Sequence, residues 1–214
     1  MQMKYIIFDL DGTLIDSMPV WKNIGGHYLE SHGFAVPADL HNIIKTQTLY
    51  QTAEYFQNVL GVPHEPQEIV DEVISYVADA YRHTIPLKPF VREYLEKQSR
   101  AGVKMCILTA SEATYIRPAL QRLDIEKYFT DILTCTELGV YKEDGRAFLT
   151  AMEKMGGTPQ DTVVFEDAYY AVKGAKAVGL TVYAVIDDEV RSTEDLQKIQ
   201  ALADRCIVDY GQLL

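Results

Sequence analysis

Short apolar runs rich in β-branched residues recur along the chain, and segments with the apolar spacing of helices separate them. Strands that are buried on both faces read as continuous apolar runs, because neither face meets water. The alternation therefore predicts an α/β fold, in which helices cover a parallel sheet. The predicted strands are 4–8, 104–108, 132–135, 162–165 and 181–186, with a weaker edge strand at 206–208.

The alternation stops between the first and second predicted strands. Residues 18–85 carry helix-period apolar positions and no convincing strand, with predicted helices at 50–60 and 69–81. A connection between strands usually needs far fewer residues. The segment is therefore predicted to form a separate helical domain, and residues 1–17 and 86–214 are predicted to form the sheet domain.

The charge and the apolar pattern exclude several classes of partner. The chain has 20 Lys and Arg against 31 Asp and Glu, a formal charge of −11, and no basic cluster of the kind that binds nucleic acid. No apolar stretch is long enough to span a bilayer, and the first apolar run meets Asp9 and Asp11 at once, unlike a signal peptide. We expect a cytoplasmic protein, monomeric or weakly homodimeric, with neither nucleic-acid nor membrane partners.

Three cysteines, Cys106, Cys135 and Cys206, are odd in number, far apart and without CxxC spacing. Disulfide frameworks and zinc sites have even or closely spaced cysteines. We therefore expect all three to be reduced thiols in the core.

Acidic residues follow two of the predicted strands. Asp9 and Asp11 lie one residue apart at the end of the first strand, and Glu166 and Asp167 follow the fourth. Open α/β sheets bind their ligands at this carboxyl edge. Carboxylates gathered there raise each other's pKa unless a cation compensates, and oxygen-only ligands favour Mg²⁺. The sequence therefore predicts a magnesium site.

The second and third strands end in residues suited to a phosphate. Thr109, Ala110 and Ser111 supply hydroxyl and backbone N–H groups just before a predicted helix, which is a suitable cradle for phosphate oxygens. Lys142 follows the third strand and could neutralise a phosphoryl group together with an attacking carboxylate.

Taken in order, Asp9-x-Asp11-Gly-Thr, Thr109, Lys142 and Glu166-Asp167 resemble the four motifs of the haloacid dehalogenase (HAD) superfamily. The resemblance is to its phosphatase and β-phosphoglucomutase-like subgroup. It covers nearly the whole chain and implies a Rossmann-like core, with residues 18–85 as a mobile α-helical cap.

The resemblance also implies roles for these residues. Asp9 would attack phosphorus and form an aspartyl phosphate, and Asp11 would protonate the leaving oxygen and then activate water. Mg²⁺ would bind Asp9, Asp167 and the backbone carbonyl of Asp11, with Glu166 bound directly or through water. The phosphoryl oxygens would be held by Thr109, the Ala110 N–H and Lys142. The expected enzyme is a phosphoric monoester hydrolase acting on a small phosphorylated metabolite.

The lysine motif departs from the family. Relatives often continue with two prolines, whereas here Lys142 is followed by Glu143-Asp144-Gly145. Without the prolines the loop is expected to be looser and the lysine less preorganised. Glu143 and Asp144 could also pair with Lys142.

Two alternatives stay open. A sugar-phosphate mutase of the β-phosphoglucomutase type would carry a cap arginine where this chain has Leu49, which favours hydrolysis, although Lys22, Lys45 or Arg82 could compensate. A non-catalytic binding protein on the same scaffold is disfavoured, because the nucleophile and metal ligands are all retained.

Some residues of the helical segment are candidates for reading the leaving group. They are Trp21, His27, Lys45, Gln47 and Tyr50, of which Lys45 is the predicted substrate contact. For Trp21 and Tyr50, packing in the core is the favoured interpretation, because both lie at helical spacing.

Overall fold

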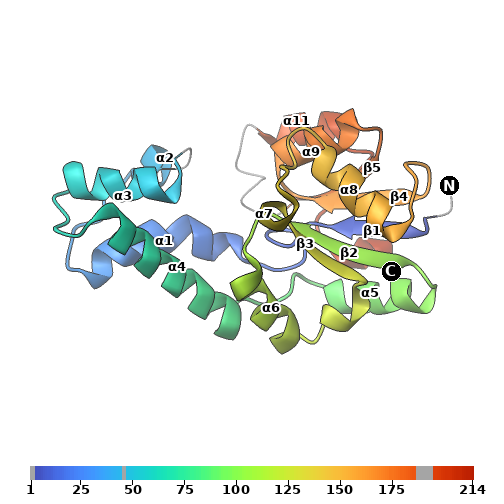
Figure 1. The fold of residues 1–214 in the computed structure, drawn as a ribbon, viewed down its shortest axis with the longest axis horizontal. Helices are drawn as coiled ribbons and strands as arrows, with labels where there is room; N and C mark the ends of the chain where they lie inside the picture. Colours follow the sequence, from blue (N-terminus) through green and yellow to red (C-terminus); the bar gives the residue numbers. More distant parts are fainter. Residues whose placement is uncertain (1–2, 45–46, 187–194) are drawn as a thin grey trace. The chain divides into compact units, whose positions relative to one another are not determined.

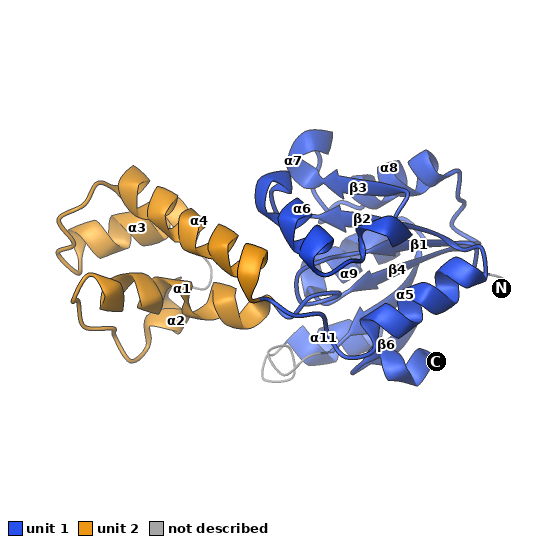
Figure 2. Cartoon of the chain, turned by 90° about the horizontal axis from the view of Figure 1, so that it is seen from below, with its two compact units in different colours: residues 1–16, 85–214 blue, residues 17–84 orange. Residues whose placement is uncertain are grey.

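The computed structural model describes residues 3–44, 47–186 and 195–214. The chain divides into two compact units, shown in Figure 2: residues 1–16 with 85–214, called here the core unit, and residues 17–84, called the helical unit. Both boundaries lie one residue before the predicted ones. That the helical unit acts as a mobile cap stays a prediction.

The core unit contains a six-stranded parallel sheet in the order β3-β2-β1-β4-β5-β6 (Figure 1). The predicted α/β fold is confirmed, and every strand end lies within one residue of its predicted place, because buried β-branched runs are a strong local signal. The strands are β1 (Tyr5–Phe8), β2 (Lys104–Thr109), β3 (Asp131–Thr134), β4 (Thr162–Glu166), β5 (Thr181–Val185) and β6 (Arg205–Ile207).

Helices follow the strands and cover the sheet. They are α5 (Val91–Arg100), α6 (Ala113–Arg122), α7 (Cys135–Leu138), α8 (Arg146–Met155), α9 (Tyr169–Ala177) and α11 (Asp195–Leu202), with 3₁₀ turns η1 (Glu126–Tyr128) and η2 (Tyr210–Leu213). On one face Ile7, which pairs with Cys106 and Val164 in the neighbouring strands, packs in a buried cluster with Phe148 of α8 and Val172 of α9.

The other face of the sheet is aromatic, because successive side chains of a strand point to opposite faces. Phe8 stacks on Phe165 with ring centroids 4.9 Å apart and meets Tyr94 of α5 edge-on at 6.3 Å. Tyr210 of η2 stacks on Phe165 at 5.5 Å. Such aromatic pairs add to the free energy of burial, so they stabilise the packing of β1 and β4, which carry the acidic motifs.

The helical unit consists of α1 (Met18–Ser31), α2 (Leu40–Ile44), α3 (Leu49–Asn58) and α4 (Pro66–His83). Its core is built from buried aromatic and aliphatic side chains, among them Tyr28, Phe56 and Tyr81. The hydroxyl of Tyr28 shares a 2.7 Å hydrogen bond with Nδ1 of His64. The core of the unit therefore combines aromatic and aliphatic packing with a hydrogen bond between two side chains.

Two expectations about packing are corrected by the structure. Trp21 is only half-buried, although its Nε1 donates to the hydroxyl of the buried Tyr81 at 2.9 Å. Tyr50 is 49% exposed and does not belong to the core. Cys106 and Cys135 are buried thiols, whereas Cys206 is exposed, so its assignment to the core is wrong. It lies on β6, at the edge of the sheet, where burial is incomplete.

Among the described helices, none has both the length and the apolar character needed to cross a bilayer.

Candidate active site

The site begins at the carboxyl end of β1. The Asp9 N–H donates to the Phe165 carbonyl at 2.9 Å, which extends the ladder between β1 and β4 by one residue. The Asp9 side chain is therefore held between two central strands, and it is 6% exposed. Because β1 and β4 are parallel neighbours, Asp9 and the acidic pair that ends β4 meet at one edge of the sheet.

Lys142 links the two acidic motifs. Its Nζ donates to Oδ1 of Asp9, and to Oε1 of Glu166 at 2.8 Å. All three side chains are buried. Removing charges from water is costly unless they are paired and hydrogen-bonded, so this cluster depends on the lysine.

The pKa values of Lys142 and Asp9 are shifted by burial and by the neighbouring charges. Burial alone would lower the pKa of Lys142, but the carboxylates of Asp9 and Glu166 hold it well above its usual range. Burial raises the pKa of Asp9; Lys142 opposes this rise, whereas the charges of Glu166 and Asp11 add to it. The site therefore carries more negative charge than one ammonium group compensates.

Glu166 uses both of its carboxylate oxygens within the protein. Oε1 accepts from Lys142, and Oε2 accepts from the backbone N–H groups of Asp167 at 2.7 Å and Ala168 at 2.8 Å. The residue therefore anchors the lysine and shapes the turn that leads into α9.

Asp11 lies near the end of β2. Its Oδ2 accepts from the Ser111 hydroxyl at 2.6 Å and from the Thr109 hydroxyl at 3.5 Å. The Ser111 N–H in turn donates to the Thr109 Oγ1 at 3.0 Å. The predicted phosphate cradle and the second aspartate are thus joined by hydrogen bonds.

The loop that carries Lys142 rests directly on α9. A Cβ atom on Gly174 would collide with the carbonyl oxygen of Lys142 and would lie 2.9 Å from that of Glu143. Gly145 has φ +80°, and a Cβ there would lie 2.6 Å from the Gly174 carbonyl oxygen. Two glycines therefore allow the close approach that positions the lysine in a loop without prolines.

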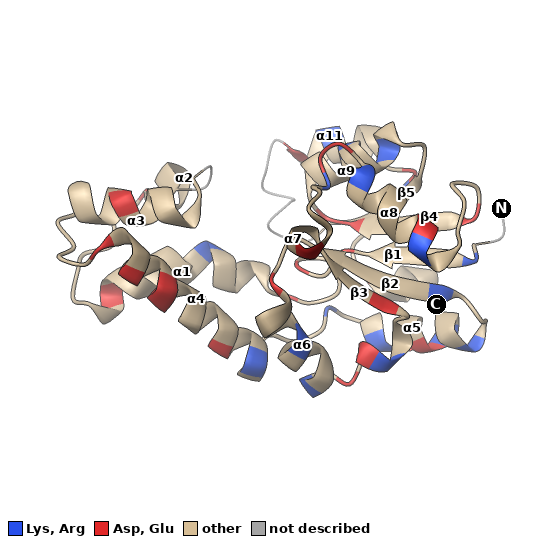
Figure 3. Cartoon of the chain, in the orientation of Figure 1, with Lys and Arg blue, Asp and Glu red and all other residues tan. Residues whose placement is uncertain are grey.

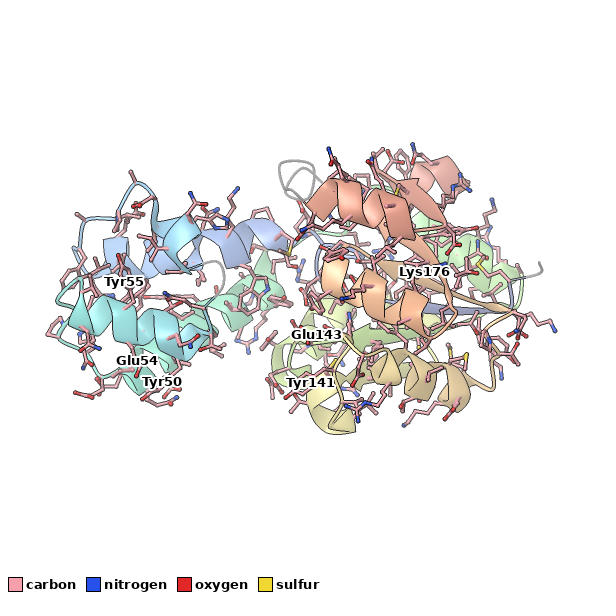
Figure 4. All side chains as sticks on the ribbon, turned by 90° about the horizontal axis from the view of Figure 1, so that it is seen from above. Tyr50, Glu54, Tyr55, Tyr141, Glu143 and Lys176 are labelled. Carbon is pink, nitrogen blue, oxygen red and sulfur yellow. The ribbon has the colours of Figure 1, made fainter. Side chains whose placement is uncertain are left out.

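The possible pairing of Glu143 and Asp144 with Lys142 is not what the structure shows. Asp144 instead accepts from Nε of Arg146 at 2.6 Å. Glu143 is exposed and lines a cavity of about 390 Å³. Its other lining residues are Ala110, Cys135, Tyr141, Lys142 and Tyr170. Figure 4 labels Tyr141 and Glu143, which come from the loop between α7 and α8.

Sequence reasoning missed the aromatic wall of this cavity. Tyr141 immediately precedes Lys142 and is 72% exposed, and Tyr170, in the first turn of α9, is 45% exposed. An exposed tyrosine next to the predicted phosphate-binding lysine is the signal that could have indicated the cavity.

The donor set fits a hard divalent cation. Asp9, Glu166 and Asp167 each offer one carboxylate oxygen, and these atoms lie within 4.8 Å of one another. Oδ2 of Asp9 is buried and has no hydrogen-bond partner among the described residues, a costly state that a cation would relieve. Because Glu166 is already hydrogen-bonded through both oxygens, Asp9 and Asp167 fit the ligand role better.

The structure brings the predicted site residues of the core unit to one sheet edge. They are Asp9, Asp11, Thr109, Ala110, Ser111, Lys142, Glu166 and Asp167. Lys45, the predicted substrate contact of the helical unit, lies outside the described residues.

His27 and Gln47, two candidates for contacting the leaving group, belong to the helical unit. His27 meets Tyr76 edge-on with ring centroids 4.8 Å apart, and Gln47 accepts a hydrogen bond from Thr52 at 3.3 Å. Acidic residues mark α3 and α4 (Figure 3), and residues 17–84 contain eight acidic and three basic side chains. This unit is therefore poor in groups that could bind a second phosphate.

Comparison with known proteins gives consistent matches. The family model of haloacid dehalogenase-like hydrolases matches residues 6–185. A phosphorylated carbohydrates phosphatase of Thermotoga maritima is 27% identical over 185 residues, covering 86% of each chain. A fructose-1-phosphate phosphatase of Escherichia coli is 26% identical over 179 residues, covering 82% of this chain and 92% of that protein.

A solved structure is also similar to this chain over nearly its whole length. The crystal structure of a Thermotoga maritima protein, provisionally described as a β-phosphoglucomutase, superposes with a TM-score of 0.84 at 26% identity. The match covers 96% of this chain and 94% of that one.

Proposed function

Because the chain belongs to the haloacid dehalogenase-like hydrolase family, we propose that it is a Mg²⁺-dependent phosphatase acting on a small phosphorylated carbohydrate. The observation that carries the proposal is the buried contact of Asp9 with Lys142, beside Asp11. Relatives named as phosphatases of phosphorylated carbohydrates and of fructose 1-phosphate support the substrate class.

In this proposal Asp9 is the nucleophile. A carboxylate oxygen of Asp9 forms a bond to phosphorus while the ester P–O bond breaks, and Asp11 gives its proton to the leaving oxygen. Water then attacks the aspartyl phosphate, and Asp11 takes the proton of that water. The cycle returns Asp9 as a carboxylate and releases inorganic phosphate.

The remaining residues hold charge and orientation. Lys142, the Thr109 hydroxyl and the Ala110 N–H would bind the phosphoryl oxygens, since phosphoryl transfer depends mainly on positioning and charge neutralisation. Asp9, Asp167 and the backbone carbonyl of Asp11 would hold Mg²⁺. When bound, the cation supplies positive charge that offsets the carboxylates and the phosphoryl group.

The residues that line the cavity beside Lys142 favour a substrate whose leaving group is uncharged. Tyr141 and Tyr170 line the cavity, and tyrosine rings suit the C–H groups of a sugar or polyol; the Glu143 carboxylate can accept hydrogen bonds from its hydroxyls. The same carboxylate would repel a second phosphate. A bisphosphate therefore fits this wall of the cavity less well than a monophosphate.

We also propose that the helical unit acts as a cap that selects the leaving group. The chain's one tryptophan, Trp21, lies in that unit, so its fluorescence reports on the cap. We expect a change when Mg²⁺ and a phosphate analogue are added together; an unchanged spectrum would count against closure near Trp21.

The mutase stays the second candidate, because a solved relative is described in those terms. Such a reaction moves the phosphate within one sugar and must hold a bisphosphate at both ends. Leu49, which stands at the position of the expected cap arginine, begins α3 and cannot bind phosphate. Hydrolysis is therefore the favoured reaction.

The deciding experiment follows phosphate release and sugar products from hexose, hexitol and polyol phosphates, including β-glucose 1-phosphate, with and without Mg²⁺. We expect Mg²⁺-dependent phosphate release that Asp9→Asn abolishes, by about 10⁴-fold or more. Glu54→Gln, on an exposed position of α3, is the control and should stay within about twofold of wild type. Glucose 6-phosphate without phosphate release would establish the mutase instead, and activity in Asp9→Asn would disprove the aspartyl-phosphate route.

A further inference from the structure

The Asp11 carboxylate accepts a short hydrogen bond from Ser111. The Ser111 hydroxyl donates to Oδ2 of Asp11 at 2.6 Å, whereas the Thr109 hydroxyl reaches the same oxygen only at 3.5 Å. A hydroxyl-to-carboxylate bond of 2.6 Å is in the range of charge-assisted hydrogen bonds, and one of 3.5 Å contributes little. Ser111 is therefore a stronger hydrogen-bond partner of this carboxylate than Thr109 is.

The Ser111 hydroxyl is itself held in place. Ser111 is 9% exposed, and its N–H donates to the Thr109 Oγ1 at 3.0 Å, which closes a tight turn directly after β2. The helix α6 begins two residues later, at Ala113. A side chain fixed between a buried strand and a helix start loses little further freedom when it forms a hydrogen bond.

We propose that Ser111 is a positioning residue for the acid–base function of Asp11, a proposal that rests on the proposed phosphatase function. By binding Oδ2, the hydroxyl fixes the rotamer of Asp11 and the direction of its other oxygen. Asp11 passes its own proton to the leaving oxygen as the ester P–O bond breaks, and Ser111 keeps its hydroxyl proton. Ser111 thus acts through Asp11 rather than on the phosphate, which distinguishes this role from the predicted phosphate contact.

Positioning of Asp11 and direct binding of the phosphoryl group differ in how strongly their effect on the rate depends on the leaving group. An alkoxide leaving from a sugar phosphate is strongly basic and needs the proton of Asp11, whereas p-nitrophenolate is a weak base and leaves without one. In the phosphoryl-transfer step, which kcat/KM reports, a residue that positions Asp11 therefore matters for sugar phosphates and little for p-nitrophenyl phosphate. Hydrolysis of the aspartyl phosphate, in which Asp11 takes the proton of water, is common to both esters and affects kcat for both. A residue that binds the phosphoryl group matters equally for both, because the group is the same.

The experiment compares Ser111→Ala with wild type on a hexose phosphate and on p-nitrophenyl phosphate, both with Mg²⁺. We expect kcat/KM for the sugar ester to fall by about 10- to 100-fold, and kcat/KM for p-nitrophenyl phosphate to fall less than about threefold. Ser111→Thr keeps the hydroxyl and should recover most of the activity. Ser99→Ala, on an exposed position of α5, is the matched control and should change neither rate.

A double-mutant cycle completes the test. If Ser111 acts through Asp11, adding Ser111→Ala to Asp11→Asn should cost the sugar ester no further activity. Equal losses of kcat/KM on both esters, or a further loss in the double variant, would overturn the proposal while leaving the phosphatase intact. Wild-type enzyme that releases phosphate from neither ester would instead overturn the proposed function. Thermal unfolding of each variant confirms that the fold is retained.

Discussion

The core unit and the helical unit place their polar side chains in opposite ways. At the ends of β1 and β4 the core unit buries Asp9, Glu166 and Asp167 around Lys142. In the helical unit most of the described acidic residues are exposed, and the interior is built from aromatic and aliphatic side chains. Buried charges of one sign reduce stability, whereas an apolar core increases it.

Under the proposed function the buried charges of the core unit perform the chemistry, which accounts for a cluster that costs stability. Among its described residues the helical unit carries no comparable buried charge. The comparison predicts that equivalent substitutions will have different consequences in the two units.

The largest effect is expected for Lys142→Met. The substitution leaves two buried carboxylates without their cation, so phosphatase activity should fall by about 10³-fold or more and stability by about 3 kcal/mol. Lys176→Met removes a partly exposed lysine that pairs with Asp204 on the surface, and it should change activity less than about twofold. Phosphate release and urea unfolding measure both quantities. Similar losses in the two variants would remove the distinction between buried and surface lysines.

The next prediction compares one glycine in each unit, and the expected changes in stability have opposite signs. Gly174→Ala places a methyl group against the Lys142 loop and should cost about 2–3 kcal/mol and about tenfold in kcat, because the lysine moves. Gly26→Ala, in α1, has only a side-chain neighbour at 3.6 Å and should stabilise the protein by about 0.5–1 kcal/mol. Thermal unfolding and kcat test the pair; an active, fully stable Gly174→Ala variant would contradict the close packing.

A smaller effect is expected from Tyr28→Phe in the helical unit. Loss of the hydroxyl leaves His64 without a 2.7 Å hydrogen bond and should cost about 1–2 kcal/mol. Activity per folded molecule should stay within about twofold of wild type, because the contact lies inside one unit. Tyr50→Phe, at an exposed position, is the control. A strong fall in kcat with normal stability would show that this hydrogen bond serves catalysis after all.

The smallest effect is expected for Asp204→Asn, which tests a surface pair of the core unit. Partial burial acts to raise the pKa of Asp204, but hydrogen bonds from Lys176 and the Val182 N–H hold it below its ordinary value. The carboxylate therefore stabilises the fold above the ordinary aspartate pKa, and this contribution is lost as the pH falls through the lowered folded-state pKa.

After allowance for solvent screening, we expect Asp204→Asn to cost about 0.5 kcal/mol at neutral pH. The difference from wild type should shrink below about pH 4. Denaturant unfolding at several pH values measures it, and a difference that grew on acidification would contradict the assigned sign.

Much of the site could be predicted without coordinates. The strands could be predicted to within one residue, because burial on both faces leaves a continuous apolar run. Parallel strands place their carboxyl ends at one edge, so Asp9, Lys142 and Asp167 could be predicted to meet there from their positions after strands. These features are local in sequence and depend only on where each strand ends.

Only the tertiary structure decided which groups touch. Glu166 uses both oxygens inside the protein, Ser111 binds Asp11 across about 100 residues of chain, and Gly174 allows the Lys142 loop to approach α9. Hydrogen-bond partners and close approaches depend on distances of a few tenths of an ångström between elements remote in sequence. A pattern of residue types determines which chemistry is available at the sheet edge, but packing decides which atom each group faces.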